Sequence, residues 1–184
     1  MYQLVTWTAP TEPFIKLNTD GNFIGNPRMA RAGGLLRDSS GRWISGFSLN
    51  LGITSNNVVE LGAVHRGIKL AWDLGVKFIH LEIDSMIVLT CLTNENSNFP
   101  LDMFPLLCDC RSLMAQAWEV QVHNTYHEAN ECVDGLAKWG NHQQQVLLIY
   151  ETFPSFVYSC YVRDMISLGS NSLCARKVAI AVDV

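Results

Sequence analysis

The chain has 184 residues, of which 48% are hydrophobic and 16% are charged, and 13 basic against 17 acidic residues give a formal charge of −4. This composition excludes a disordered or collagen-like chain and suits one globular domain with a short extension at either end. Because the net charge is negative, a polyanionic partner would have to be held by local contacts. No apolar run reaches the roughly 18 to 20 residues of a membrane span, so we expect no membrane partner.

The first residues, Met1 to Trp7, lack the basic segment followed by an apolar segment that marks a secretory signal. We therefore expect an intracellular protein, nuclear or cytoplasmic, in a reducing compartment. The six cysteines include no Cys-x-x-Cys pair, and Cys108 and Cys110 form only a weak zinc signal. Reduced cysteines with a structural role are the expectation.

Three strands are predicted near the start of the chain. After an extended, proline-containing lead-in over residues 1–13, residues 14–22 alternate between apolar and polar side chains, which is typical of a half-buried strand. Turn signals at Gly25-Asn26-Pro27 and Asp38-Ser39-Ser40-Gly41 separate this segment from further strands over 30–37 and 42–49. Successive strands joined by short turns predict an antiparallel meander.

Helices and strands alternate after the meander. Apolar residues at helical spacing predict a long helix over 57–74. The elements expected after it are a strand over 78–84, helices over 85–92 and 104–116, a strand over 118–126 and a helix over 130–140. A helix that connects two strands implies parallel pairing. We therefore predict an α/β domain over 14–141 with a five-stranded mixed sheet flanked by helices, followed by an extension of uncertain structure over 142–184.

Four carboxylates stand where such a fold could bring them together. Asp20 lies on the polar face of the first strand, and Asp84 follows a later strand, where sites in open sheets gather. Glu60 heads the apolar stripe of the long helix, and Asp134 borders the packing face of the last one. Structural alternatives exist: Asp84 as a helix cap, Asp20 as a turn residue, Glu60 as the partner of an Asn57 cap, and Asp134 as an acid that suits the helix dipole.

A cluster of these acids would require cations. Each pair at about 4 Å would repel by roughly 4 kcal/mol in an effective dielectric of about 20. Ligands that are oxygen only suit Mg²⁺ or Mn²⁺ rather than zinc. Two such ions roughly 3.5 to 4 Å apart can activate water and stabilise the leaving oxygen of a phosphodiester.

Local motifs surround these acids and the neighbouring turns. They are Leu17-Asn18-Thr19-Asp20-Gly21, Gly25-Asn26-Pro27, Thr54-Ser55-Asn56-Asn57-Val58-Val59-Glu60, Ile83-Asp84-Ser85, and Glu128-Ala129-Asn130 followed by Asp134, Leu136 and Ala137. Together they resemble a type 1 ribonuclease H domain over about residues 7–140. More narrowly, Trp7-Thr8-Ala9-Pro10 and Gly33-Gly34-Leu35-Leu36-Arg37-Asp38 resemble the plant members derived from retrotransposon reverse transcriptases.

The resemblance implies a metal-dependent endoribonuclease that cuts the RNA strand of RNA–DNA hybrids by two-metal phosphodiester hydrolysis. The implied catalytic residues, which are also the implied metal ligands, are Asp20, Glu60, Asp84 and Asp134. They would hold two Mg²⁺ or Mn²⁺ ions when substrate is bound. The implied partner is the hybrid, and we expect a monomer.

Substrate contacts are implied by position at Asn26, Asn56, Asn57 and Gly21. Short amide side chains can donate to and accept from the 2′-hydroxyls that line the wide, shallow groove of a hybrid. The structural alternative is that Asn56 and Asn57 only cap the long helix.

The chain departs from the family at one loop. Where many members have a mobile histidine, this chain has Asn124, flanked by His123 and His127. Either histidine could substitute, although a histidine shifted by one position in a loop points elsewhere. Loss of a proton-transfer group typically costs about 10² to 10⁴ in rate, so we expect reduced activity. The alternative function is a catalytically weak or silent nucleic-acid-binding domain derived from a retrotransposon.

Overall fold

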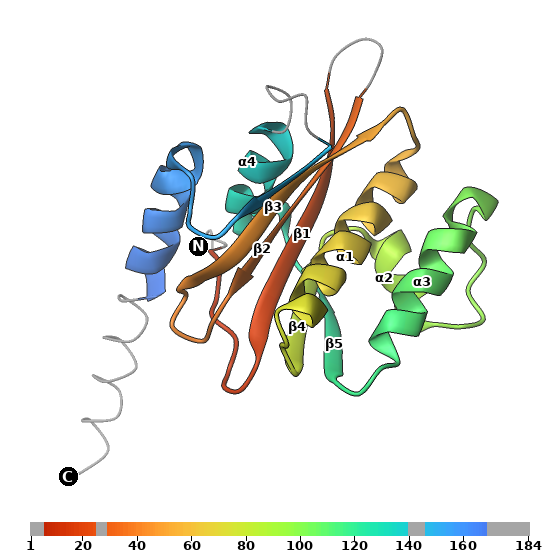
Figure 1. The fold of residues 1–184 in the computed structure, drawn as a ribbon, viewed down its shortest axis with the longest axis horizontal. Coiled ribbons are helices and arrows are strands. Elements are labelled where there is room, and N and C mark those ends of the chain that lie inside the picture. The colour runs from red at the N-terminus through yellow and green to blue at the C-terminus, as the bar shows by residue number, and fades with distance from the viewer. Residues whose placement is uncertain (1–5, 25–28, 140–145, 169–184) are drawn as a thin grey trace, which may run out of the picture.

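The computed structural model describes residues 6–24, 29–139 and 146–168, which form a mixed sheet with helices packed against it (Figure 1). The strands lie in the order β5-β4-β1-β2-β3-β6. Their bounds are β1 Ile15–Ile24, β2 Met29–Arg37, β3 Trp43–Gly52, β4 Phe78–Ile83, β5 Glu119–Asn124 and β6 Leu147–Tyr150. The helices are α1 Asn56–Asp73, α2 Met86–Thr93, α3 Phe104–Met114 and α4 Glu131–Trp139, with short 3-10 turns η1 Leu101–Met103, η2 His127–Ala129 and η4 Ser155–Val157. A last helix covers residues 158–168.

The predicted pairing of the strands is confirmed. β1, β2 and β3 form the antiparallel meander. β4 pairs with the other side of β1 in parallel, and β5 pairs with β4 in parallel, as the connecting helices require. The register between β1 and β4 pairs Asn18 with Glu82. This register carries the chain that follows β4 to the level of residue 20.

The sheet has six strands rather than the predicted five. Leu147–Tyr150 forms β6, which pairs antiparallel with β3 and falls inside the extension over 142–184. Four consecutive apolar or aromatic residues show no alternation, so the sequence does not distinguish them from a loop or a helical turn. The strand forms because the edge of β3 offers unpaired backbone groups, which β6 satisfies.

One face of the sheet is covered by α1, with α2 and α3 beside it (Figure 1). The core on this side contains Leu17, Leu36 and Phe47 from the strands, and Val64 and Ile68 from α1, all fully buried. The helical spacing of apolar residues in α1 therefore matches the face that it buries. The helices predicted over 57–74, 85–92 and 104–116 are confirmed with small shifts of their ends.

The opposite face is covered by α4 and the helix over 158–168. Leu35, Val133, Leu136 and Val157 are buried in this second core. Gly33 permits the close approach, because a Cβ at this position would lie 2.6 Å from the backbone nitrogen of Ala137. α4 therefore rests directly on β2, with its first turns beside the end of β1.

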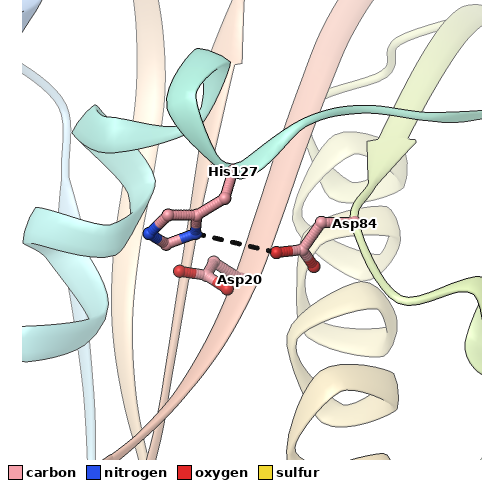
Figure 2. A group of neighbouring side chains, drawn as sticks. All are labelled: Asp20, Asp84 and His127. Atoms are coloured by element: carbon pink, nitrogen blue, oxygen red, sulfur yellow. Dashed lines mark ion pairs between the residues drawn. The ribbon is translucent and has the colours of Figure 1, made fainter.

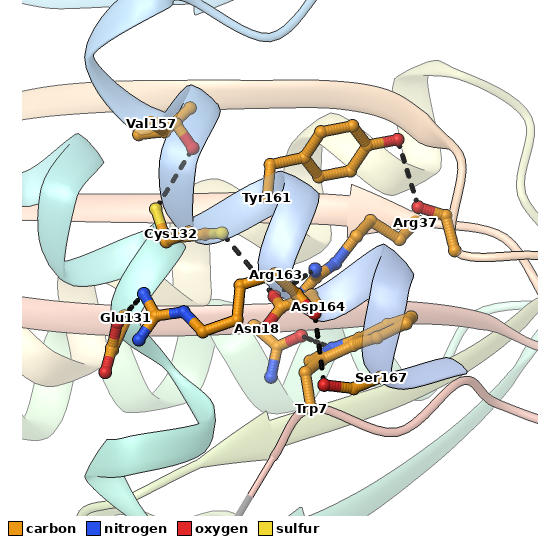
Figure 3. A network of polar contacts seen from close by, with 12 residues as sticks. Trp7, Asn18, Arg37, Glu131, Cys132, Val157, Tyr161, Arg163, Asp164 and Ser167 are labelled. Atoms are coloured by element: carbon orange, nitrogen blue, oxygen red, sulfur yellow. Dashed lines mark hydrogen bonds and ion pairs between the residues drawn. The ribbon is translucent and has the colours of Figure 1, made fainter. Parts of the chain in front are cut away.

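The two ends of the described chain meet around Arg37 (Figure 3). Arg37 is buried, and its guanidinium lies 3.6 Å from the ring centroid of Trp7 and donates to Asp164 Oδ2 at 2.7 Å. The indole N–H of Trp7 donates to Asn18 Oδ1 at 2.9 Å. A cation–π contact, an ion pair and a hydrogen bond thus join the lead-in and the last helix to the sheet.

The described cysteines have free thiols, and Cys91, Cys110 and Cys132 are buried. Cys108 is exposed, and among the described residues neither Cys108 nor Cys110 belongs to a group that could hold a metal ion. In the part of the chain that the structure describes, no helix combines the length and the apolar character needed to cross a membrane.

Candidate active site

Asp20 lies at the centre of the candidate site, inside β1 and not in a turn, and is only 3% exposed. Asp84 follows β4, the parallel neighbour of β1, and the register of these strands sets it beside Asp20. Ser85, and not Asp84, caps α2 by accepting a hydrogen bond from the N–H of Val88. The structural alternatives of a turn for Asp20 and a cap for Asp84 are therefore wrong.

Glu60 reaches the site from the first turns of α1. Its Oε2 accepts a hydrogen bond from the backbone N–H of Gly21 at 3.1 Å. Gly21 has no room for a side chain, because a Cβ there would lie 2.3 Å from Val59 Cγ1. The cap of α1 is Ser55, so the alternative role of Glu60 as the partner of an Asn57 cap is wrong. Glu60 is free to act in the site.

Asp134 reaches the site from α4, on the far side of β1 from α1. Its Oδ1 accepts a hydrogen bond from the side chain of Asn22 at 3.1 Å, and its Oδ2 lies 2.5 Å from Lys138 Nζ. Asn22 is two residues after Asp20 on β1, so both side chains lie on the same face of the strand. The strand that carries Asp20 therefore also orients Asp134.

His127 adds a nitrogen to this group of oxygens (Figure 2). One ligand atom each from Asp20, Asp84 and His127 lie within 4.8 Å of one another. His127 Nδ1 lies 3.8 Å from Asp84 Oδ2. The imidazole comes from the short turn η2, which precedes α4.

The neighbouring carboxylates affect the ionisation of Asp20 and Glu60. Burial raises the pKa of Asp20 to about 8, and the charges of Asp84 and Asp134 add to the effect. Burial also raises the pKa of Glu60 to about 9, with contributions from Asp20 and Asp84. Both shifts mean that the ionised cluster is unfavourable without added positive charge.

These residues fit a divalent cation. The site presents carboxylate oxygens from four elements, with Asp20 almost fully buried, and hard oxygen donors are the ligands that Mg²⁺ and Mn²⁺ take. Among the described residues, the basic groups that pair with these acids are His127 and Lys138, both at its edge and more than half exposed. Neither replaces a cation between the carboxylates.

The predicted substrate positions lie partly beside this cluster. Gly21 follows Asp20 and touches Glu60. Asn56 and Asn57 are the first residues of α1, one turn before Glu60, and neither is its cap. Asn26 lies outside the described residues. Whether any of them contacts nucleic acid stays a prediction.

At the end of β5, where the loop to α4 begins, Asn124 stands at the position where the resemblance leads us to expect a histidine. The side chain of Asn124 donates to the backbone oxygens of Ile83 at 3.2 Å and Asp84 at 3.4 Å, so it fastens the loop and carries no titratable group. His123 instead lies against His80 on the sheet, with ring centroids 4.0 Å apart. Only His127 of the two flanking histidines is found beside the acids.

Sequence reasoning missed two polar residues at the site, Asn22 and Lys138, and named His127 only as one of two substitutes for the loop histidine. Both missed residues had a usable signal. Asn22 follows Asp20 by two positions on a strand, and Lys138 follows Asp134 by four on a helix, which are the spacings of neighbours on one face. His127 had no such signal, because its direction depends on the turn η2.

Comparisons with known proteins agree with this arrangement. The family described as "Reverse transcriptase-like" matches residues 18–140. "Putative ribonuclease H protein At1g65750" of Arabidopsis thaliana is 38% identical over 138 residues, a match that covers 74% of this chain and 22% of that protein. The chain therefore spans about a fifth of the length of this curated relative.

Solved structures show the same fold. RNase H1 from the halophilic archaeon Halobacterium salinarum NRC-1 matches with a TM-score of 0.65 and 25% identity, over 70% of this chain and 98% of that one. LC11-RNase H1 in complex with an RNA/DNA hybrid matches with a TM-score of 0.63 and 21% identity, over 68% of this chain and 94% of that one. With the family match over 18–140, these findings show that the chain belongs to the reverse transcriptase-like family and carries an RNase H-like domain.

Proposed function

We propose that the chain is a metal-dependent endoribonuclease that cleaves the RNA strand of RNA–DNA hybrids. The observation that carries this proposal is the approach of four carboxylates from β1, α1, the end of β4 and α4. A relative named as a ribonuclease H protein and an RNase H1 structure with 25% identity support it. The hybrid bound in the LC11-RNase H1 structure is the substrate class that we propose for this chain.

In this proposal Asp20, Glu60, Asp84 and Asp134 hold two Mg²⁺ or Mn²⁺ ions. Such ions, when bound, activate the attacking water and stabilise the leaving oxygen of the phosphodiester. The chain itself keeps the carboxylates in place: the N–H of Gly21 orients Glu60, and the side chain of Asn22 orients Asp134. In-line attack of water on phosphorus leaves a 3′-hydroxyl and a 5′-phosphate.

Recognition of the hybrid is assigned to the start of α1, to Gly21 on β1 and to Asn26, which lies outside the described residues. Asn56 is exposed and Asn57 partly exposed, and both stand at a helix N-terminus, where the backbone N–H groups favour anions. Their amides can contact the 2′-hydroxyls that distinguish the RNA strand. Gly21 and Asn26 complete the proposed contact set. We propose that the domain acts as a monomer. We also propose a retrotransposon origin, which the family description supports.

A cleavage assay tests the proposal. Purified protein with Mg²⁺ or Mn²⁺ should cut an end-labelled RNA–DNA hybrid, and should leave duplex DNA of the same sequence intact. Asp84→Asn should lower the rate by at least about 10- to 100-fold, because it removes one proposed ligand. His123→Ala is the control, since its ring lies against His80 and not against the acids.

The second candidate is a domain that binds hybrids without turnover. Asn124 favours this binding-only candidate, because its amide cannot transfer a proton as a histidine can. The amide instead donates hydrogen bonds to the backbone oxygens of Ile83 and Asp84. Binding of the hybrid by the wild-type protein, without cleavage at saturating metal, would favour this candidate over the endoribonuclease.

A further inference from the structure

His127 gives the acidic cluster a nitrogen donor, and this feature extends the proposed function. We propose that His127 Nδ1 is a ligand of one metal position, together with Asp20 and Asp84, and that this position therefore prefers Mn²⁺ to Mg²⁺. The inference rests on the proposed function for the presence of metal. It differs from that proposal in naming a nitrogen ligand and a selectivity.

The placement of the imidazole carries the inference. Nδ1 of His127 lies 3.8 Å from Asp84 Oδ2, and ligand atoms of His127, Asp84 and Asp20 lie within 4.8 Å of one another. Metal–ligand bonds of about 2.0 to 2.2 Å separate donor atoms around one ion by about 3 to 4.4 Å. The 3.8 Å separation lies in this range, and separations of up to 4.8 Å need only a small contraction to reach it. Figure 2 shows the ring beside the Asp20 carboxyl, with one nitrogen facing Asp84.

The loop that carries His127 is fastened at both ends to the strands of the acids. At its start, the side chain of Asn124 donates to the backbone oxygens of Ile83 and Asp84. At its end, the buried side chain of Asn130 donates to the backbone oxygen of Thr19 at 3.0 Å, one residue before Asp20. The imidazole is therefore positioned by the same two backbone segments that position the carboxylates.

The chemistry of the donor set gives the selectivity. Mg²⁺ takes oxygen ligands and gives up its water reluctantly, whereas imidazole is a ligand of transition-metal ions. Mn²⁺ accepts both kinds of donor and also supports phosphodiester hydrolysis. A position with two carboxylates and one imidazole should therefore lose more Mn²⁺ affinity than Mg²⁺ affinity when the imidazole is removed.

An ion pair between His127 and Asp84 is the competing explanation. The side chain of His127 is 62% exposed, and exposed ion pairs contribute little. An ion pair would need Asp84 alone, whereas the imidazole also lies near Asp20. The two explanations differ in whether the nitrogen touches a bound ion.

Pulsed electron paramagnetic resonance of bound Mn²⁺ makes this distinction. The whole chain, with ¹⁵N-labelled histidine, should show a ¹⁵N coupling to Mn²⁺ in the wild type and in His123→Ala, and no such coupling in His127→Ala. Calorimetry should show an Mn²⁺ affinity at least about tenfold lower in His127→Ala, with a smaller change for Mg²⁺. Circular dichroism should show the same folded content in all three proteins.

Three results would overturn the inference, and they separate it from the proposed function. Mn²⁺ binding without ¹⁵N coupling, or with equal affinity in His127→Ala, removes the ligand role, while hybrid cleavage by the same protein would keep the proposed endoribonuclease. If neither ion binds the folded wild-type chain and the hybrid stays intact, both proposals fail.

Discussion

The backbone N–H of Gly21 donates to Glu60 Oε2 at 3.1 Å, immediately after the buried Asp20. This hydrogen bond links the central strand to α1 at the point where their carboxylates approach. It lowers the pKa of Glu60, while burial and the neighbouring charges raise it more strongly. Glycine at this position thus serves both the packing of α1 and the geometry of the site.

Gly21→Ala should destabilise the protein and reduce cleavage. The added Cβ would lie 2.3 Å from Val59 Cγ1 and 3.1 Å from Glu60 Cδ, so α1 must move away from β1. Overpacking of this kind costs about 1–3 kcal/mol, measurable as a lower free energy of unfolding in urea. Val59→Ala in the same chain removes the clashing methyl group. The double variant should be more stable than the sum of the single losses predicts, and strict additivity would contradict the clash.

Asp84→Asn should stabilise the metal-free protein although it should slow the proposed cleavage. The charge of Asp84 opposes the ionisation of both Asp20 and Glu60. Removal of that repulsion should raise the free energy of unfolding in chelator by about 0.5–2 kcal/mol. Gains of this size are common when a residue that serves function at the expense of stability is replaced. Saturating metal should reverse the order, because the wild type gains more from binding than the variant. A variant less stable than the wild type in chelator would contradict the repulsion.

The stability of the metal-free protein should fall as pH rises. Burial raises the pKa of Asp20 from 3.8 to about 8 and that of Glu60 from 4.5 to about 9. The unfolded chain therefore releases these protons near pH 4, whereas the folded chain retains them until about pH 8 to 9. Their stabilising effect is complete below the unfolded pKa and is lost as pH rises through the folded pKa.

Urea unfolding in chelator over this pH range measures the effect. Asp20→Asn should flatten the decline, because the asparagine cannot ionise. Protons retained on these carboxyls also compete with a bound metal, so the metal affinity of the wild type should increase with pH up to about pH 8 to 9. Metal-free stability that is independent of pH would show that these carboxyls titrate normally.

The sequence predicted the fold well where a long periodic pattern was available. Residues 14–22 alternate and form β1, and residues 57–74 repeat at helical spacing and form α1. The acids could be proposed because Asp20 lies on the polar face of an alternating strand. The other three follow a strand or stand near a helix start next to such a pattern. β6 could not be predicted, because its four residues carry no period and its pairing depends on the edge of β3.

The helix caps and the position of His127 depend on tertiary contacts that local sequence does not predict. Ser55 and Ser85 cap α1 and α2, although Asn57 and Asp84 were equally good candidates by residue type. The cap is the residue with extended backbone at the helix start, which tertiary packing selects. His127 likewise reaches the acids through η2, a turn fixed by the long-range contact between Asn130 and Thr19. The spacing of residues along the sequence does not predict that contact.

Asp164→Asn should destabilise the protein by about 3 kcal/mol, because it removes one partner of a buried ion pair. The side chain of Arg37 is 1% exposed and that of Asp164 is 17% exposed. In the variant the guanidinium would lose the anion that balances its charge and would keep its contact with the ring of Trp7. Glu131→Gln is the matched control, because its ion pair also includes a residue of the last helix. Glu131 pairs with Arg163, but their side chains are 47% and 56% exposed, so the control should lose less than about 1 kcal/mol.

Urea unfolding of both variants measures the difference, and cleavage of the hybrid should persist in each because neither residue belongs to the acidic cluster. A loss below about 1 kcal/mol for Asp164→Asn would show that the Arg37–Asp164 pair stabilises the protein no more than an exposed ion pair does. In that case the buried contacts of Val157 and Tyr161 with the second core would hold the last helix on the sheet.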